Sequence, residues 1–167
     1  MKAQPHPHYV MPHHRAPLRL SRNRRYGVYA IGGTLWLSGA AWLVLHYLLM
    51  RAGPFGDEPH PLEPWALRLH AAMAFASIWT FGLVWGAHIV LGWRTRRHRV
   101  SGGLAVALLG GLIATGYLLY YLGDDQWRSV NAIAHWAAGL ALPLLLAVHI
   151  VRGRRRARGS AQRPGLQ

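Results

Sequence analysis

Hydrophobic residues occur in four long blocks that are separated by short polar segments. The blocks span residues 26–50, 65–93, 102–122 and 129–151. Each is long enough to cross a hydrocarbon core about 30 Å thick as a helix. The longest connection, 51–64, contains four prolines, which disfavour helix there. Short connections make successive helices antiparallel neighbours. The pattern therefore predicts an all-α membrane protein, a four-transmembrane-helix antiparallel bundle.

The charges alternate in sign along the chain. With 19 Lys and Arg against 5 Asp and Glu, the net charge of +14 makes nucleic-acid binding a candidate. However, sixteen of the basic residues lie in 2–25, 94–99 and 152–163, whereas every acidic residue lies in 51–64 or 123–128. Such alternation follows the positive-inside rule. It predicts a lipid bilayer as partner, no nucleic acid, and both termini in the cytoplasm.

Three segments follow from this composition. We expect a disordered, basic, His-rich cytoplasmic arm over 1–25, a transmembrane domain over 26–151, and a basic cytoplasmic tail over 152–167. The arm's histidines could bind a metal ion, although a flexible arm is the favoured interpretation: His6, His8, His13 and His14. The chain has no cysteine, which excludes disulfides, thiolate metal sites and covalently attached haem.

Five histidines lie within or at the ends of the spans: His46, His70, His88, His135 and His149. His70 and His88 are eighteen residues apart, which is five full helical turns, so they share a face about 27 Å apart. His135 and His149 are fourteen residues apart, about 21 Å. A single histidine would more often be a hydrogen-bonded core residue. Two pairs on two helices favour ligands.

Several kinds of site could use such histidines. Zinc or copper gathers its ligands at one level through short spacings, unlike the spacing here. A proton relay would need carboxylates or closely spaced histidines, and the spans contain no Asp or Glu. Two haems, each held between two neutral imidazoles, fit the pattern best.

The topology predicts which histidines pair. Helices two and four both enter from outside, so His70 pairs with His135 near the outer surface and His88 with His149 near the inner surface. The unequal spacings differ by about one turn, to be absorbed by tilt or by a kink at Pro143. His46 competes with His70 for the outer site.

Small residues form ladders in two spans. In the first, Gly32, Gly39 and His46 recur every seven residues and share a face, and in the third, Gly102, Gly103, Gly110 and Gly111 form a similar ladder. Such ladders serve close helix packing or open space for a flat macrocycle, and both interpretations stay open.

These residues resemble the bacterial four-helix b-type cytochromes, which include the cytochrome b561 type and the b subunits of nickel–iron hydrogenases and formate dehydrogenases. The resemblance covers 26–151, and its best match is His135-Trp-Ala-Ala-Gly139 followed by His149. The pairing of His70 with His135 is also similar. The inner site departs from the pattern, because members often take that ligand from the first span and here His88 would replace it.

The resemblance implies a di-haem cytochrome of the bacterial inner (plasma) membrane that passes electrons between a quinone pool and a partner oxidoreductase subunit. It implies an electron-transfer protein or a subunit of an oxidoreductase complex rather than a stand-alone enzyme, and a homodimer is a candidate assembly. Gly39 and Gly139 would border the haems. Arg68 would pair with haem propionates, although an interfacial arginine is the favoured interpretation.

Two alternatives stay open. In a non-redox assembly or scaffolding subunit, the histidines would hydrogen-bond across helices and the glycines would pack them. A reductase for ferric iron or another small substrate would need a flavin or nicotinamide domain, and no such motif is present in this sequence.

Overall fold

The computed structural model describes residues 22–94 and 99–161. The histidines of the basic arm lie outside these residues. Helix α1 (Arg22–Tyr47) begins before the expected start of the first span, so the last four residues of the segment expected to be an arm are helical. The connection after α1 forms a small hairpin of β1 (Arg51–Gly53) and β2 (Gly56–Glu58), which the hydrophobic pattern did not predict.

The second span consists of three helical segments with two kinds of turn. It consists of α2 (Glu63–Val84), a π-helix η1 (Trp85–Val90) and a short α3 (Leu91–Arg94). A π-helix closes its hydrogen bonds from i to i+5, so it places more residues in each turn than an α-helix. His88 lies inside η1. The assumption of one regular α-helix from His70 to His88 is therefore wrong.

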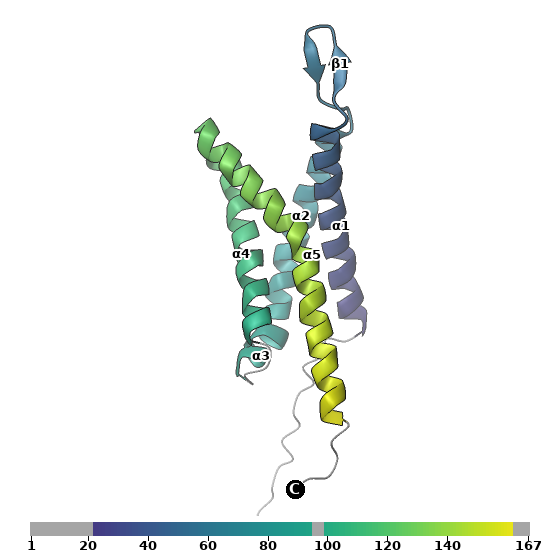
Figure 1. The fold of residues 1–167 in the computed structure, drawn as a ribbon, viewed down its shortest axis with the longest axis vertical. Coiled ribbons are helices and arrows are strands. Elements are labelled where there is room, and N and C mark those ends of the chain that lie inside the picture. Colours follow the sequence, from purple (N-terminus) through teal and green to yellow (C-terminus); the bar gives the residue numbers. More distant parts are fainter. Residues whose placement is uncertain (1–21, 95–98, 162–167) are drawn as a thin grey trace, which may run out of the picture.

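The first two spans form one helical hairpin, and a second helical hairpin is built from α4 (Arg99–Tyr121) and α5 (Asp125–Ala161). The carboxylate of Asp124 accepts the backbone N–H of Trp127 at 2.9 Å, a cap that starts α5. Pro143 lies at the midpoint of α5, where proline removes a backbone hydrogen bond. Figure 1 shows α5 changing direction about halfway along its length.

The four long helices form two hairpins that touch each other sparingly. Helix α1 packs mainly on α2 and α4 mainly on α5, while the hairpins meet at α1–α5 and at α3–α4. Figure 1 shows the start of α1 and the end of α5 at the same end of the molecule. All four long helices are long and apolar enough to cross a membrane. The expected fold class is confirmed, and it is that of a multi-pass membrane protein.

Side chains fill little of the space between the hairpins. In the described part of the chain, no large side chain is fully buried, and the buried residues are Ala105, Ser38 and Ser101. The two serines are 5% exposed, which is unusual for polar residues unless a partner satisfies them. Each of these serines lies beside one of the paired histidines, as described next.

Candidate functional site: two interhelical histidine pairs

The structure brings four of the five span histidines together as two pairs. His70 on α2 and His135 on α5 have ring centres 6.3 Å apart, with ring planes at 86°. His88 on η1 and His149 on α5 have ring centres 6.3 Å apart, with ring planes at 89°. In both pairs one histidine comes from each hairpin. The spatial pairing expected from the topology is therefore present.

The ring spacing agrees with what two imidazoles need to bind one metal ion between them. A metal ion lies about 2.0–2.1 Å from an imidazole nitrogen, and the ring centre lies about 1.1 Å behind it, giving centres about 6–6.5 Å apart. Aromatic rings in direct edge-to-face contact also span this range, at about 4.5–7 Å. The decisive evidence is therefore the state of the ring nitrogens.

The pair of His70 and His135, named the outer pair after the membrane side expected for it, has its Nδ1 atoms engaged by the chain itself. Nδ1 of His70 lies 3.0 Å from the carbonyl oxygen of Leu35 on α1. A carbonyl can only accept, so this Nδ1 carries the proton and Nε2 keeps its lone pair. The hydroxyl of Ser38 donates to the same carbonyl at 2.9 Å and lies 3.4 Å from Nδ1. His70 is thus held in the tautomer that binds a metal through Nε2.

His135 is held in the same way by helix α4. Its Nδ1 lies 2.9 Å from the hydroxyl oxygen of Thr115, and that hydroxyl donates its own proton to the carbonyl of Gly111 at 2.7 Å. The Thr115 oxygen is therefore an acceptor for the Nδ1 proton. In the inner pair, Nδ1 of His149 lies 3.0 Å from the hydroxyl of Ser101. Metal-binding histidines characteristically donate their second ring N–H to such acceptors.

A glycine lies against three of the four rings. A methyl group at Gly39 would lie 2.8 Å from Cε1 of His70, one at Gly116 would lie 3.2 Å from Cε1 of His135, and one at Gly102 would lie 3.6 Å from Cε1 of His149. The absence of a side chain lets each imidazole lie close to the neighbouring backbone. Of the two predicted ladders, Gly39 and Gly102 contact histidines, whereas Gly32, Gly110 and Gly111 have nothing within 4 Å.

Helix α4 carries the same two-residue unit twice. Ser101-Gly102 serves His149 and Thr115-Gly116 serves His135, and the two units are fourteen residues apart, as are the two histidines. The spacing of histidines and glycines did not predict Gly116 or the hydroxyl partners. The signal that would have found them is this repeat, because an antiparallel helix of equal spacing presents its two units at the two levels of its neighbour.

Three residues predicted at the sites contact residues other than the paired histidines. Nδ1 of His46 lies 2.8 Å from Oε1 of Glu63, so His46 joins the ends of α1 and α2 and is in neither pair. Arg68 is exposed, with its guanidinium 4.8 Å from the centre of the Trp65 ring. The position of Gly139 faces Leu112 of α4, with 3.8 Å to a Cβ placed there.

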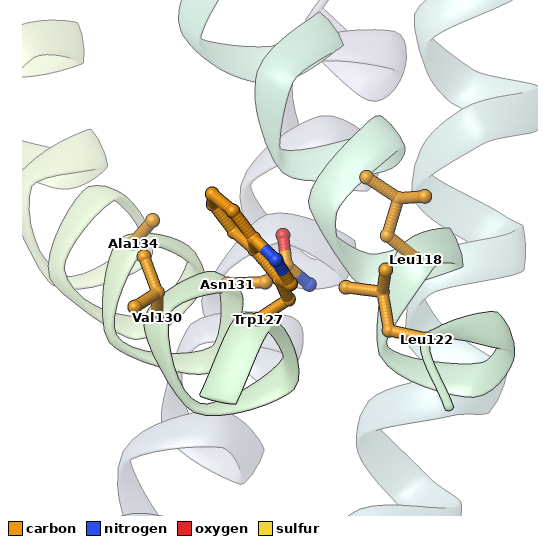
Figure 2. Close-up of a pocket in the computed structure, with 6 residues that line it drawn as sticks. All are labelled: Leu118, Leu122, Trp127, Val130, Asn131 and Ala134. Carbon is orange, nitrogen blue, oxygen red and sulfur yellow. The ribbon is translucent and has the colours of Figure 1, made fainter. Parts of the chain in front are cut away.

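Two apolar hollows lie along helix α5. One, of about 300 Å³, lies between α4 and α5 near their connection. Figure 2 shows its lining, with Asn131 as the polar residue among Leu118, Leu122, Trp127, Val130 and Ala134. The amide of Asn131 donates to the carbonyl of Thr115 at 2.9 Å, which connects this wall to the residue that holds His135. Neither hollow is lined by a paired histidine, so the pairs define the candidate site.

The donor set fits a haem better than a bare metal ion. Within residues 22–94 and 99–161, no three His, Cys, Asp or Glu side chains gather where they could hold a metal ion. A zinc ion would need three or four such ligands. A haem iron already has four ring nitrogens and takes axial imidazoles from the protein. In the pair of His70 and His135, two opposed imidazoles, with their Nδ1 atoms engaged and glycines beside them, match that need.

Comparisons with protein-family models, with curated proteins and with solved structures find no match to this chain.

Proposed function

We propose that this protein is a membrane-bound di-haem b-type cytochrome that transfers electrons across the bilayer, between a quinone and a partner redox protein. The observation that supports it is the pair of interhelical histidine couples with equal ring spacing, one from each hairpin. Bound haem would supply iron that takes up and releases one electron. In this proposal the protein is an electron carrier or a subunit of an oxidoreductase complex in a bacterial plasma membrane.

The chain's own contribution is to hold the imidazoles of His70, His135 and His149 in place. Leu35, Thr115 and Ser101 accept the Nδ1 protons or lie within hydrogen-bond distance of that nitrogen. This leaves Nε2 as the donor atom and makes it more basic. The apolar helices keep water away, and the low dielectric around a site of this kind tunes its reduction potential.

The two pairs would form a path through most of the membrane. His135 and His149 are fourteen residues apart on α5, about 21 Å along a straight helix, within a hydrocarbon core of about 30 Å. With the basic end of the bundle in the cytoplasm, the pair of His70 and His135 would be the outer site.

The direct test is haem content and spectrum after expression with sufficient haem. We expect about two haems per chain, and a b-type absorption change when dithionite reduces the purified protein. A chain that binds no haem would overturn the proposal. It would favour the scaffolding role, particularly if stability and partner association survive His135→Ala and His149→Ala.

A further inference from the structure

One polar side chain, Asn131, lies half-buried within the membrane-spanning part of α5. Its amide nitrogen lies 2.9 Å from the carbonyl oxygen of Thr115 on α4. A carbonyl can only accept, so the amide turns its N–H group toward Thr115. Thr115 lies inside α4, where helix geometry already pairs its carbonyl with the backbone. The bond from Asn131 therefore links the two helices and is not needed to satisfy this carbonyl.

Asn131 and His135 bond to the same residue of α4. They are four residues apart, so they lie on one face of α5, one turn from each other. Asn131 donates to the backbone oxygen of Thr115, and Nδ1 of His135 lies 2.9 Å from its hydroxyl oxygen. That hydroxyl donates in turn to the carbonyl of Gly111 at 2.7 Å. Two bonds between one turn of α5 and one residue of α4 fix the distance and rotation at which His135 meets Thr115.

The inner pair has no equivalent of this second bond. Nδ1 of His149 lies 3.0 Å from the hydroxyl of Ser101. The residue four before His149 is Leu145, which is half-buried like Asn131 but has no hydrogen-bonding side chain. Burying an amide among apolar helices costs free energy unless it is hydrogen-bonded. An asparagine at one level only therefore favours a role at that pair over a general role in helix packing.

We propose that Asn131 is a positioning residue for the outer pair, acting through Thr115 on the Nδ1 atom of His135. This inference rests on the proposed function for the use of His135 and adds the residue that holds its ring. With α5 fixed against Thr115, the Nδ1 proton stays bonded to the hydroxyl oxygen and Nε2 keeps its lone pair. Donation from Nδ1 makes Nε2 more basic, which stabilises an oxidised iron and lowers its reduction potential.

The first measurement uses the haem-free full chain in detergent and identifies the tautomer of His135. Nitrogen NMR of the isotope-labelled imidazole distinguishes a proton on Nδ1 from one on Nε2. We expect the proton on Nδ1, and we expect Asn131→Leu, which introduces the residue type of Leu145, to produce a mixture of tautomers. Val130→Ala is the matched control. Val130 lines the same hollow as Asn131 and is 54% exposed, so its truncation should leave the tautomer unchanged.

The second measurement uses the haem-loaded chain in a His149→Ala background, which leaves the outer pair. Asn131→Leu should weaken haem binding about two- to tenfold, as expected for the loss of one hydrogen bond, and should raise the reduction potential. In a His135→Ala background, where only the inner pair is complete, it should change neither. Thr115→Val removes the hydroxyl through which Asn131 acts, so adding Asn131→Leu to it should not change the potential further.

Two outcomes would overturn the inference. An unchanged tautomer or an unchanged potential in the Asn131→Leu chain, whatever its thermal stability, would mean that Asn131 only packs helices. Additive effects of Asn131→Leu and Thr115→Val on the potential would mean that Asn131 does not act through Thr115. An unsubstituted chain that binds no haem overturns the proposed function, whereas the tautomer of the haem-free chain still decides the inference. Asn131→Ala, which adds no bulk, replaces Asn131→Leu if that variant does not fold.

Discussion

The two histidine pairs have the same ring spacing, but the two hairpins achieve it differently. The α4–α5 hairpin is regular, with Ser-Gly and Thr-Gly units fourteen residues apart facing histidines fourteen residues apart. The α1–α2 hairpin carries its histidines eighteen residues apart and reaches the inner level through the π-helix η1. Because a π-turn holds extra residues, it shortens the second span and re-aims His88. The α4–α5 hairpin thus places both of its histidines with regular helix geometry, whereas the α1–α2 hairpin needs the π-helix to bring His88 to the level of His149.

The largest effect is expected from removing one histidine of each pair, which tests whether the two pairs are equivalent. His135→Ala and His149→Ala should each remove one of two haems per chain, because each deletes one axial ligand of a different pair. Haem and iron quantified per chain would measure this. His46→Ala is the control and should keep both haems, since His46 pairs with Glu63. A loss of haem in His46→Ala would return that residue to the outer site.

The π-helix should matter to the inner pair alone. Inserting an alanine after Gly86 adds a residue to η1 between His70 and His88, which would rotate His88 by about 100° relative to His70. We expect loss of the inner haem with the outer haem retained, measured by haem content and by redox titration. Gly86→Ala keeps the residue count and meets nothing within 4 Å, so it should retain both haems. Equal haem content in the two variants would contradict this role of η1.

The cost of replacing each glycine by alanine should follow the distance from the added methyl group to the neighbouring histidine ring. Gly39→Ala should cost about 1–3 kcal/mol of stability and displace His70, because its methyl group would lie 2.8 Å from Cε1. Gly116→Ala should act more weakly at 3.2 Å, and Gly102→Ala at 3.6 Å should be tolerated. Haem affinity and thermal unfolding would establish the order. Gly32→Ala, with nothing within 4 Å, is the control.

Removing the hydroxyl partner of His135 or of His149 should weaken haem binding to a similar extent at the two pairs. Thr115→Val and Ser101→Ala each remove an oxygen within hydrogen-bond distance of a histidine Nδ1, so haem affinity at that level should fall about 10–100-fold. Reduction potentials should shift as well. Thr80→Val removes a hydroxyl that bonds within its own helix and should leave both sites unchanged. Effects confined to folding, without a change in potential, would argue against a role for these hydroxyls at the sites.

The smallest effect is expected at the junction of α1 and α2. Glu63→Gln weakens the contact with His46, whose side chain is 40% exposed. An ion pair with this exposure contributes about 0–1 kcal/mol, so thermal unfolding should shift little. Haem content should stay the same. A lowered haem content would mean that this junction also positions Gly39 against His70.

Much of the architecture could be predicted from local patterns. The four spans and the helical fold class followed from blocks of apolar residues, and the pairing of levels followed from spacing and antiparallel order. The expected haems, electron transfer and cytoplasmic termini stay predictions. The assumption of regular α-helical turns throughout the second span was wrong, because hydrophobicity does not distinguish α-helical from π-helical turns.

The remaining features depend on how each helix is rotated against its neighbour. Whether His46 meets Glu63 or a haem iron, and whether Arg68 meets Trp65 or a propionate, depends on helix rotation that no single segment specifies. The length of an apolar block and the spacing of histidines within it are properties of one segment of the chain. The sequence by itself therefore determined the spans and the levels of the histidines. Contacts across helices depend on register and rotamer together, so only the tertiary structure decided the Nδ1 partners and the supporting glycines.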